Sequence, residues 1–416
     1  MQRPRVLVID EEVPWPANTG KRIRTLNLLT ALADHFAIDV LTHANETPRE
    51  AVDEMTRRGM TVHLAPGGVA AKKGLLFPIR VATSVARRLP YSVHAHDRRP
   101  FRQALQRLLR QHRYQLVHCE WTPYALYARG LDVPVCIAAH NLEWIIWRRL
   151  SDAESRAPLK ALFRVQAALM ERFEKRVFEE FGSATAVSEP DAELIRRMGC
   201  RQVVVVPNGV DVDAYDPRPE QTPEPRTLVF AGSLDWRPNQ DAIRWFIDAV
   251  HPVLSARTAY RFWIVGRTPP DWLTRDGAVP PEITVVGEVD DVRPWIARAA
   301  VSVVPLRVGG GSRLKILEAL AMGRAVVSTT VGAEGLDLEP GAELLLADAA
   351  DAFAAAIADL FNDDARRRRL GSAGRQRVET SYRWDRIANI QRSLWNDIIR
   401  SRPPQSSRGA RAPARR

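Results

Sequence analysis

The segment that decides the fold is residues 301–323, which read VSVVPLRVGGGSRLKILEALAMG. The apolar run 301–305 predicts a short buried β-strand, and the pattern of residues 313–322 predicts a helix that Gly323 ends. A glycine-rich loop joins the two elements. A strand, a tight loop and a helix in this order are typical of parallel α/β sheets. The free amides and the dipole at such a helix N-terminus suit a bound phosphate.

The same segment carries side chains that suit an anionic sugar ligand. Ser312 is a good N-cap, so the helix is expected to begin next to it. Arg313 and Lys315 place positive charge in the first helical turn, where a purely structural helix prefers acids. This local conflict favours a functional role. Glu318, one to two turns later, can accept hydrogen bonds from sugar hydroxyls. The structural alternative is a glycine-rich turn followed by a solvated helix.

Outward from this segment, short apolar runs alternate with amphipathic segments along the whole chain. The runs predict strands at residues 5–9, 37–42, 61–64, 116–119, 133–139, 184–187, 203–206, 227–231, 261–265, 283–286, 301–305, 325–328 and 343–346. Helical patterns lie between most of them. This alternation predicts an α/β protein with parallel, doubly wound sheets.

The composition divides the chain into two similar halves. Residues 216–226 contain four prolines and little apolar content, which is typical of a linker. We therefore expect a Rossmann-like domain over 1–207, a linker over 208–225 and a second Rossmann-like domain over 226–385. A helix over 386–400 is expected to return to the first domain, and the basic tail 401–416 to be disordered. Ligands of such sheets bind at the strand C-terminal ends, which predicts a site between the domains.

The segment 301–323 resembles the donor-binding motif of the family-4 retaining glycosyltransferases. Their GT-B fold has two Rossmann-like domains that face a central cleft. The family pattern is a Glu, seven residues and a second Glu, which holds the ribose of a nucleotide-sugar. Glu318 matches the second Glu, whereas Gly310 stands at the first position. Some members share a Gly-Gly-Gly-Ser/Thr-Arg-Leu-Lys stretch here. The resemblance implies that backbone amides of Gly310, Gly311 and Ser312 replace the missing Glu at the donor.

Two segments of the first half are similar to further motifs of that family. Gly20 follows the first strand and opens a helix, and in the family this glycine loop lets the backbone approach the donor phosphate and the acceptor. A tight turn explains the glycine equally well. His140 begins a His-Asn-x-Glu stretch after the strand 133–139. The matching family histidine points into the cleft near the transferred sugar, and a structural histidine is the alternative.

Two segments of the second half also resemble the family. Residues 230–239 match a stretch in which the family usually has an Arg and a Lys that hold the donor diphosphate. Ser233 and Pro238 stand at those two places, so we expect Arg237 to supply the charge together with the cations of segment 301–323. Val289 is similar to the apolar contact that the family makes with the nucleobase. A surface arginine and an ordinary turn are the respective alternatives.

The resemblance implies a retaining, metal-independent glycosyltransferase. It would move a hexose from a nucleotide diphosphate sugar to a hydroxyl of a glycan or lipid-linked acceptor, in polysaccharide or glycolipid biosynthesis. We expect His140, Arg313 and Lys315 to carry catalysis, because the departing nucleoside diphosphate needs its charge neutralised. No Asp-x-Asp motif lies near the predicted cleft, so neither a metal nor a cofactor is expected. Two alternatives are a non-catalytic GT-B-like scaffold that binds a nucleotide or a membrane, and a nucleotide-sugar epimerase.

The net charge of +11 is distributed unevenly. Eleven Lys and Arg and a single acid, Asp97, lie between Lys72 and His118, and residues 401–416 add five Arg. Basic clusters attract phosphates, which predicts either contact with an anionic membrane surface or a plain solvated surface. Residues 101–113 have apolar and basic positions at helical spacing, which fits a bilayer or a sheet. No nucleic-acid recognition motif is found, so no nucleic-acid partner is expected.

Composition excludes several classes of protein. With 416 residues, 45% hydrophobic and 26% charged, the chain is neither collagen-like, coiled coil nor fully disordered. No stretch approaches the roughly 20 apolar residues of a membrane span. The N-terminal apolar run is too short for a signal peptide, so we expect a cytoplasmic protein that lies peripherally on the inner face of the membrane if its basic clusters contact lipid. Cys119, Cys136 and Cys200 lack metal-ligand spacing and are expected to be small buried residues.

Overall fold

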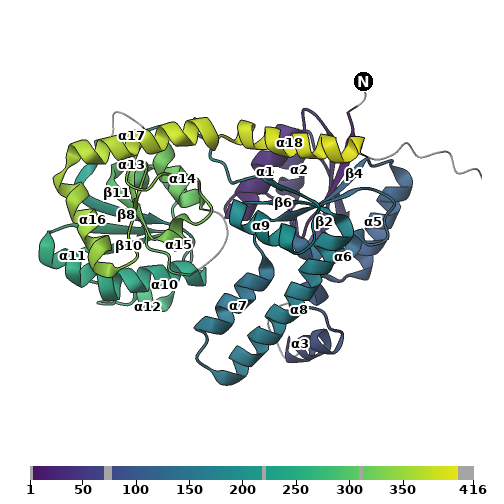
Figure 1. The fold of residues 1–416 in the computed structure, drawn as a ribbon, viewed down its shortest axis with the longest axis horizontal. Coiled ribbons are helices and arrows are strands. Elements are labelled where there is room, and N and C mark those ends of the chain that lie inside the picture. The colour runs from purple at the N-terminus through teal and green to yellow at the C-terminus, as the bar shows by residue number, and fades with distance from the viewer. Residues whose placement is uncertain (1–2, 70–76, 218–221, 309–312, 402–416) are drawn as a thin grey trace, which may run out of the picture.

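The computed structural model describes residues 3–69, 77–217, 222–308 and 313–401, and contains two parallel β-sheets covered by helices (Figure 1). The first sheet has the order β3-β2-β1-β4-β5-β6-β7. Its strands are β1 (Arg5–Ile9), β2 (Ala37–His43), β3 (Thr61–Ala65), β4 (Leu116–Cys119), β5 (Val135–Ala139), β6 (Ser183–Ala186) and β7 (Gln202–Val205). Because the chain runs outward from β1 to β3 and then returns to pair β4 with β1, the sheet has its switch point between β1 and β4.

The second sheet has the order β10-β9-β8-β11-β12-β13 and its switch point between β8 and β11. Its strands are β8 (Glu224–Ala231), β9 (Arg261–Val265), β10 (Ile283–Gly287), β11 (Ala299–Val304), β12 (Ala325–Ser328) and β13 (Leu345–Leu346). The predicted architecture of two doubly wound parallel sheets is confirmed. The central strands are continuous apolar runs because helices bury both faces of each sheet.

Helices follow most strands in both domains. The helices before β8 are α1 (Gly20–Leu32), α2 (Arg49–Arg57), α3 (Phe77–Ala86), α4 (Tyr91–His96), α5 (Arg99–Gln111), α6 (Ala125–Ala128), α7 (Glu143–Ala153), α8 (Ala157–Phe181) and α9 (Glu189–Arg197). Those after it are α10 (Arg237–Trp245), α11 (His251–Arg257), α12 (Asp271–Thr274), α13 (Arg293–Arg298), α14 (Leu314–Ala321), α15 (Thr330–Ala333), α16 (Ala350–Asn362), α17 (Asp364–Ser381) and α18 (Trp384–Arg400).

The strand bounds predicted from the sequence patterns lie close to the observed bounds, with one clear error near the linker. The bounds of β1, β4, β9 and β12 are those predicted. Strand β8 instead begins at Glu224, inside the proline-rich stretch that was predicted to be linker. Proline is compatible with the end of a strand, and Glu224 pairs with Ala299 before the register shifts. The three cysteines are buried and unpaired, as expected for small apolar residues.

Residues 101–113 pack on the sheet and do not offer an apolar face to a bilayer. Phe101, Leu105 and Leu108 of helix α5 are buried in the core of the first domain. The strong amphipathic pattern of this segment therefore reflects ordinary packing of a helix against a sheet. The interpretation of these residues as a bilayer-facing helix is wrong.

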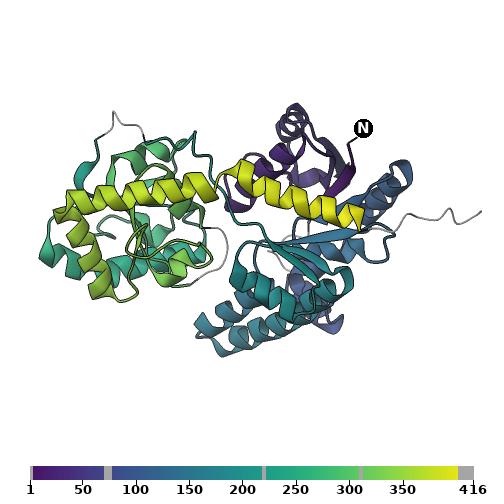
Figure 2. The ribbon, with the colours of Figure 1, turned by 45° about the horizontal axis from the view of Figure 1, so that its top comes forward.

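Helices α17 and α18 run across one side of the molecule and connect the two domains (Figures 1 and 2). Helix α17 packs on α14 of the second domain, whereas α18 packs on α1 of the first. Trp395 of α18 is fully buried, and its ring lies edge-on to that of Phe36 at 5.2 Å between centroids. Helix α18 is thus a structural part of the first domain.

The chain that links the domains is also fixed by a buried arginine. Arg24 of α1 is 3% exposed and donates hydrogen bonds to the carbonyl oxygens of Val206 and Pro207 at 2.7 and 2.6 Å. A third bond reaches Asn208 Oδ1 at 3.2 Å. Burial lowers the pKa of Arg24 to about 10, so the guanidinium stays charged at neutral pH. This clamp sets where the first domain ends and the connection begins.

The packing of α18 leads to a test of stability. Trp395→Ala is expected to lower the free energy of unfolding by about 3–5 kcal/mol, because it leaves a large cavity between α18 and α1. Trp236→Ala is the matched control, since Trp236 is 41% exposed and its loss should cost less than about 0.5 kcal/mol. Urea denaturation followed by circular dichroism measures both. Equal stability of the two variants would show that α18 does not anchor to the first domain as described.

Candidate functional site

The strand–loop–helix segment of the second domain positions two of the predicted cations. Residues 309–312 lie outside the described residues, so the predictions for Gly310, Gly311 and Ser312 have no structural counterpart here. Helix α14 begins at Leu314, and Arg313 holds the N-cap position that was predicted for Ser312, so this prediction is wrong by one residue. Lys315 and Glu318 therefore project from the first two turns of α14, directly after the loop at the end of β11.

Arg313 is buried against an acid that the sequence did not single out. Its side chain is 4% exposed, and its Nε donates to the Glu334 carbonyl oxygen at 3.2 Å. An ion pair joins its guanidinium to the Glu334 carboxylate at 3.2 Å. Burial lowers the pKa of Arg313, and Glu334 opposes that shift. Glu334 also lies 3.4 Å from Arg149 of helix α7, so one carboxylate contacts an arginine from each domain.

Lys315 is held in a largely neutral setting. Its Nζ donates to Asn239 Oδ1 at 2.7 Å and lies 4.3 Å from the centre of the Phe230 ring. Burial, and then the charge of Arg313, lower the pKa of Lys315 to about 7. An anion bound beside it would reverse this shift. The lysine is therefore placed to gain its full charge on ligand binding.

Glu318 faces the connection between the domains. Tyr215 lies seven residues after Asn208, the residue that Arg24 contacts. It donates a hydrogen bond to the Glu318 carboxylate. Burial raises the pKa of Glu318, while Tyr215 and Lys315 oppose the shift. A half-buried carboxylate with one phenol partner keeps further acceptor capacity for hydroxyl groups.

The loops after β8 and β9 lie in close contact and bring forward a further arginine. A Cβ on Gly266 would stand 1.9 Å from the Gly232 carbonyl oxygen, so this approach needs glycine. The Nε of Arg267 donates to Ser233 Oγ at 2.8 Å. Arg267 thus lies beside the position at which the donor motif usually carries an arginine.

The two other predicted residues of this domain lie on neighbouring loops. Arg237 is exposed at the first position of α10. Val289 is partly buried and packs on the core just after β10, on the loop whose Gly287 carbonyl accepts from the Gly266 amide at 2.8 Å. The structure therefore places Arg267, Val289 and the start of α10 along the same strand-end edge of the sheet.

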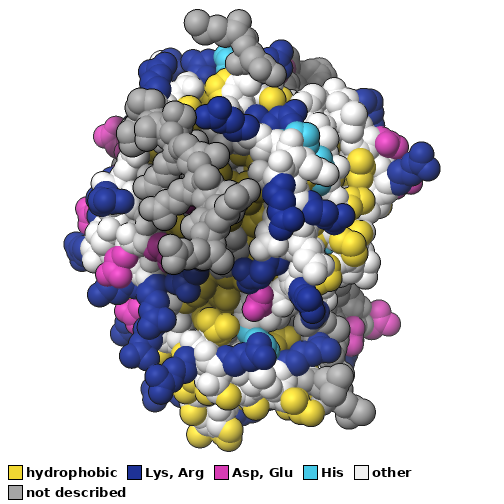
Figure 3. Space-filling view, turned by 90° about the vertical axis from the view of Figure 1, so that its right-hand side faces the viewer, with side chains coloured by type: hydrophobic (Ala, Val, Ile, Leu, Met, Phe, Trp, Pro, Cys, Tyr) yellow, Lys and Arg dark blue, Asp and Glu magenta, His cyan; other side chains and the backbone are white. Residues whose placement is uncertain are grey.

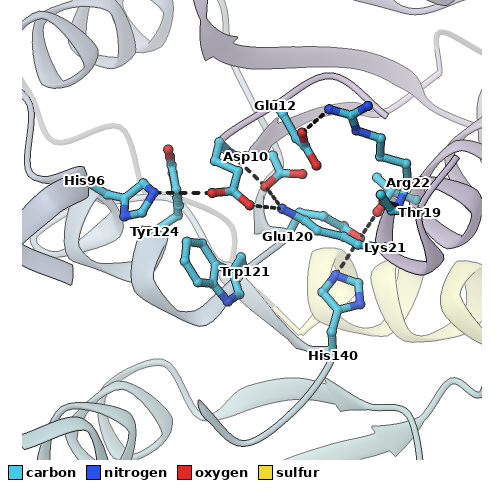
Figure 4. Close-up of polar contacts among 12 residues, drawn as sticks. Asp10, Glu12, Thr19, Lys21, Arg22, His96, Glu120, Trp121, Tyr124 and His140 are labelled. Carbon is cyan, nitrogen blue, oxygen red and sulfur yellow. Dashed lines mark hydrogen bonds and ion pairs between the residues drawn. The ribbon is translucent and has the colours of Figure 1, made fainter. Parts of the chain in front are cut away.

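In the first domain, His140 lies on a buried carboxylate at the end of β5 (Figure 4). Its Nε2 is 3.1 Å from Glu120 Oε1, and that oxygen accepts a 2.8 Å bond from Thr25 Oγ1. The other Glu120 oxygen lies 3.0 Å from His118 Nε2. Burial alone would raise the pKa of Glu120, but the two histidines hold it well below its usual value. Burial lowers the pKa of His140, while Glu120 opposes the shift. A neutral ring with its proton on Nε2, the nitrogen nearer Glu120, would leave Nδ1 as an acceptor.

Gly20 lies at the start of α1, next to a second buried charge cluster (Figure 4). Lys21 Nζ contacts Asp10 at 2.6 Å and Glu11 at 3.1 Å. Burial raises the pKa of Asp10 to about 7, although Lys21 opposes the shift. Glu11 also lies 3.3 Å from His96 Nε2. This cluster fixes the loop from β1 to α1 at the strand-end edge of the first sheet.

A pocket lies between the two domains. It is lined by Asn141, which directly follows His140, and by Arg313 and Glu334 of the second domain. Ser188, which caps helix α9, is also part of its wall. The pocket lining therefore includes one of the predicted cations, Arg313, and the residue next to the predicted histidine.

Two findings about the described residues concern metal binding and membrane-spanning helices. Within them, no group of three or more His, Cys, Asp or Glu side chains is arranged to hold a metal ion. No helix there is long and apolar enough to cross a membrane.

The sequence analysis did not identify the residues that contact and orient the predicted side chains. Glu120, Asn239, Tyr215, Arg267 and Glu334 each contact a predicted residue or its loop, but they come from other strands and loops. A signal existed for Glu120 and Arg267, since each lies within two residues of the end of a predicted strand. Their contacts depend on which strands are neighbours, which the sequence did not give.

Comparisons with known proteins place this geometry in a family. The family described as "Glycosyltransferase Family 4" matches residues 24–214, and "Glycosyl transferases group 1" matches residues 225–363. A phosphatidyl-myo-inositol mannosyltransferase of Mycobacterium leprae is 31% identical over 206 residues, which are 48% of this chain and 54% of that protein. The match thus spans about half the length of that relative.

Solved structures share the fold across nearly the whole chain. A sucrose-phosphate synthase from Thermosynechococcus elongatus has a TM-score of 0.71 at 19% identity, covering 96% of this chain and all of that one. Anabaena HepE in complex with UDP and glucose has a TM-score of 0.62 at 14% identity, covering 94% and 98%. With both family matches on consecutive parts of one chain, this protein belongs to the GT-B glycosyltransferases of the family-4 type.

Proposed function

We propose that this protein transfers a hexose, with retention of anomeric configuration, from a nucleotide diphosphate sugar to a hydroxyl of a glycan or lipid-linked acceptor. The observation that carries the proposal is the pocket between the domains, where Arg313 of the second domain and the residue next to His140 of the first meet. The second domain binds the donor in this proposal, and the first binds the acceptor.

The donor half of the site contains three cations that can contact the two phosphates of the donor. Lys315 and Arg267 lie at the strand-end loops beside Ser233, and Arg313 lies at the start of α14. They take over the role of the cations missing at Ser233 and Pro238, with Arg237 as a further contact at the rim. Glu318 accepts the ribose hydroxyls, and Val289 contacts the base. The backbone of Gly20, Gly310, Gly311 and Ser312 completes the contacts to phosphate and sugar.

The reaction breaks the bond from the sugar C1 to the diphosphate oxygen, forms a bond from C1 to the acceptor oxygen, and moves the proton of the acceptor hydroxyl to the departing diphosphate. Negative charge grows on the departing diphosphate, and preorganised Lys315 and Arg313 stabilise it. The Nδ1 of His140 accepts a hydrogen bond from a sugar hydroxyl, while Glu120 fixes the ring. In this mechanism the side-chain cations neutralise the leaving group, and transfer is proposed to need no metal ion or cofactor.

The names of two similar proteins support a choice of substrate class. The Mycobacterium leprae protein is named for mannosyl transfer to a phosphatidylinositol, and HepE was solved with UDP. We therefore propose that this protein acts in polysaccharide or glycolipid biosynthesis.

The first test is nucleotide binding. Among UDP, GDP, ADP and TDP, one is expected to raise the melting temperature, since a ligand at 100 times its dissociation constant adds about 2.7 kcal/mol. EDTA should leave the shift unchanged. Glu318→Gln should weaken binding roughly tenfold or more, because it removes a charged acceptor of the ribose hydroxyls. Absence of any shift would contradict the proposal and favour a non-catalytic scaffold.

The lowered pKa of Lys315 predicts a pH dependence of donor binding. Below pH 7 the lysine is already charged, so affinity for the nucleotide diphosphate sugar, whose diphosphate has no group that ionises near neutral pH, should be constant. Above pH 7 the free lysine is neutral and must take up a proton on binding, so the dissociation constant should rise toward about tenfold per pH unit. Calorimetry in buffers of different ionisation enthalpy measures the proton uptake. Lys315→Gln should bind more weakly with a flat profile; a sloped profile in that variant would contradict the assignment.

Glu120 is expected to act as a positioning residue for His140. Glu120→Gln keeps the shape but allows the His140 ring to change its tautomer, which should lower kcat about 100-fold. The KM for the donor should change little. Glu179→Gln is the control, since Glu179 is an exposed residue of α8 in the same domain and pairs with Lys175. A purely structural role of Glu120 would lower stability without this split between kcat and KM.

A further inference from the structure

A carboxylate that the proposed reaction does not use lies fully buried in helix α8. Glu174 is 0% exposed. Its Oε1 accepts a hydrogen bond from the Glu143 amide at 3.1 Å, and its Oε2 accepts one from the Trp144 amide at 3.2 Å. Both amides belong to the first turn of α7, where backbone N–H groups have no partner within the helix. Glu174 therefore caps α7 from a neighbouring helix.

Helix α7 has no cap of its own. Leu142 holds its N-cap position and makes no side-chain hydrogen bond there, whereas Ser, Thr, Asp or Asn is usual at such a position. Burial, and then the charge of Glu143, raise the pKa of Glu174, while the two amide bonds oppose the shift. An apolar side chain in the same place would avoid this desolvation cost. The buried carboxylate thus indicates a requirement for holding the start of α7.

Most of α7 is only partly buried. Among its described side chains Ser151 alone is buried, although the helix contains two tryptophans and two isoleucines. Helices α7 and α8 pack on each other and project from the first domain (Figure 1). Figure 3 shows hydrophobic side chains at this lower end of the molecule. The direction of α7 therefore depends strongly on α8 and on the cap at its first turn.

The capped end of α7 continues the segment that starts at His140. Glu143 Oε1 accepts a hydrogen bond from Trp121 Nε1 at 2.9 Å. Trp121 directly follows Glu120, whose Oε1 lies 3.1 Å from His140 Nε2. The segment is thus fixed at both ends, by Glu120 at the histidine and by Glu174 at the helix.

The same segment forms the first-domain wall of the pocket between the domains. Asn141, Ile145 and Arg149 are among the residues that line it. Arg149 also lies 3.4 Å from Glu334 of the second domain. A shift of the first turn of α7 would therefore move this wall and the histidine loop together.

We infer that Glu174 is a positioning residue for the proposed transfer: its buried carboxylate holds the first turn of α7 and thereby sets the place of His140 and of the first-domain wall of the pocket. Because it is fully buried, Glu174 acts through the backbone of α7 and not by contact with a substrate. The catalytic part of this inference rests on the proposed function, whereas the capping part does not.

Hydrogen–deuterium exchange of the full chain, measured by mass spectrometry, tests the cap. Glu174→Gln keeps the size of the side chain but replaces one acceptor oxygen by an NH₂ group, so one amide of the first turn loses its partner. Exchange of these amides, in a peptide that covers 143–150, is expected to become at least about fivefold faster. Glu171→Gln is the matched control, since Glu171 is exposed on the same helix, and it should exchange like the unchanged protein. Equal exchange in the two variants would overturn the inference.

Turnover tests the link to catalysis. The assay is hydrolysis of UDP-glucose or GDP-mannose, in which water takes the place of the acceptor. Glu174→Gln should lower kcat about tenfold, because His140 is displaced, while the KM for the nucleotide sugar should change less than about twofold. Glu174→Asp keeps the charge but shortens its reach, so it should lie between the Gln variant and the unchanged protein in both measurements. A lower melting temperature with unchanged kcat would show a merely structural role and contradict the inference.

Failure of this inference and failure of the proposed function give different results. If the unchanged protein binds no nucleotide and hydrolyses neither sugar, the proposed function fails, and exchange at α7 still decides whether Glu174 caps the helix. If the unchanged protein is active and Glu174→Gln matches Glu171→Gln in exchange and in kcat, the inference alone is wrong.

Discussion

The common direction of the strands is the constraint on which the rest of this structure depends. In a parallel sheet every strand ends at the same edge, and the loops that follow must meet there. Glu120 and His140 come together in this way from the ends of β4 and β5. Arg267 and Ser233 do so from the ends of β9 and β8. Residues far apart in the sequence thus form one polar edge in each domain.

The charged side chains at this edge are partly buried, and the residues that contact them determine their pKa values. Burial alone would raise the pKa of Glu120, yet two histidines hold it well below its usual value, and Thr25 donates a further hydrogen bond to the same carboxylate. Lys315 has a neutral amide and an aromatic ring as its nearest partners, so burial brings its pKa to about 7. The first arrangement is fixed before any ligand binds. In the proposed function the donor diphosphate completes the second arrangement, so the two domains have different parts in the reaction.

The two edges must also face each other, and local sequence does not provide this. Helix α18 anchors on α1 through Trp395, and Arg24 clamps the chain at Val206 and Pro207. Between these supports, Glu334 contacts Arg313 and Arg149 from opposite domains. The pocket that carries the proposed function is formed at this junction.

The sequence by itself determined the fold class and the positions of most strands, and it singled out Glu318 and His140 as candidate site residues. It could do so because buried strands in a parallel sheet are continuous apolar runs, and because a glycine loop before a helix is a local signal. Only the tertiary structure decided that residues 101–113 face the core, that β8 begins within the proline-rich stretch, and that Glu120, Tyr215, Arg267 and Glu334 support the site. These outcomes depend on strand order and on which face of a helix is covered, and both are set by contacts between residues that are distant in the chain.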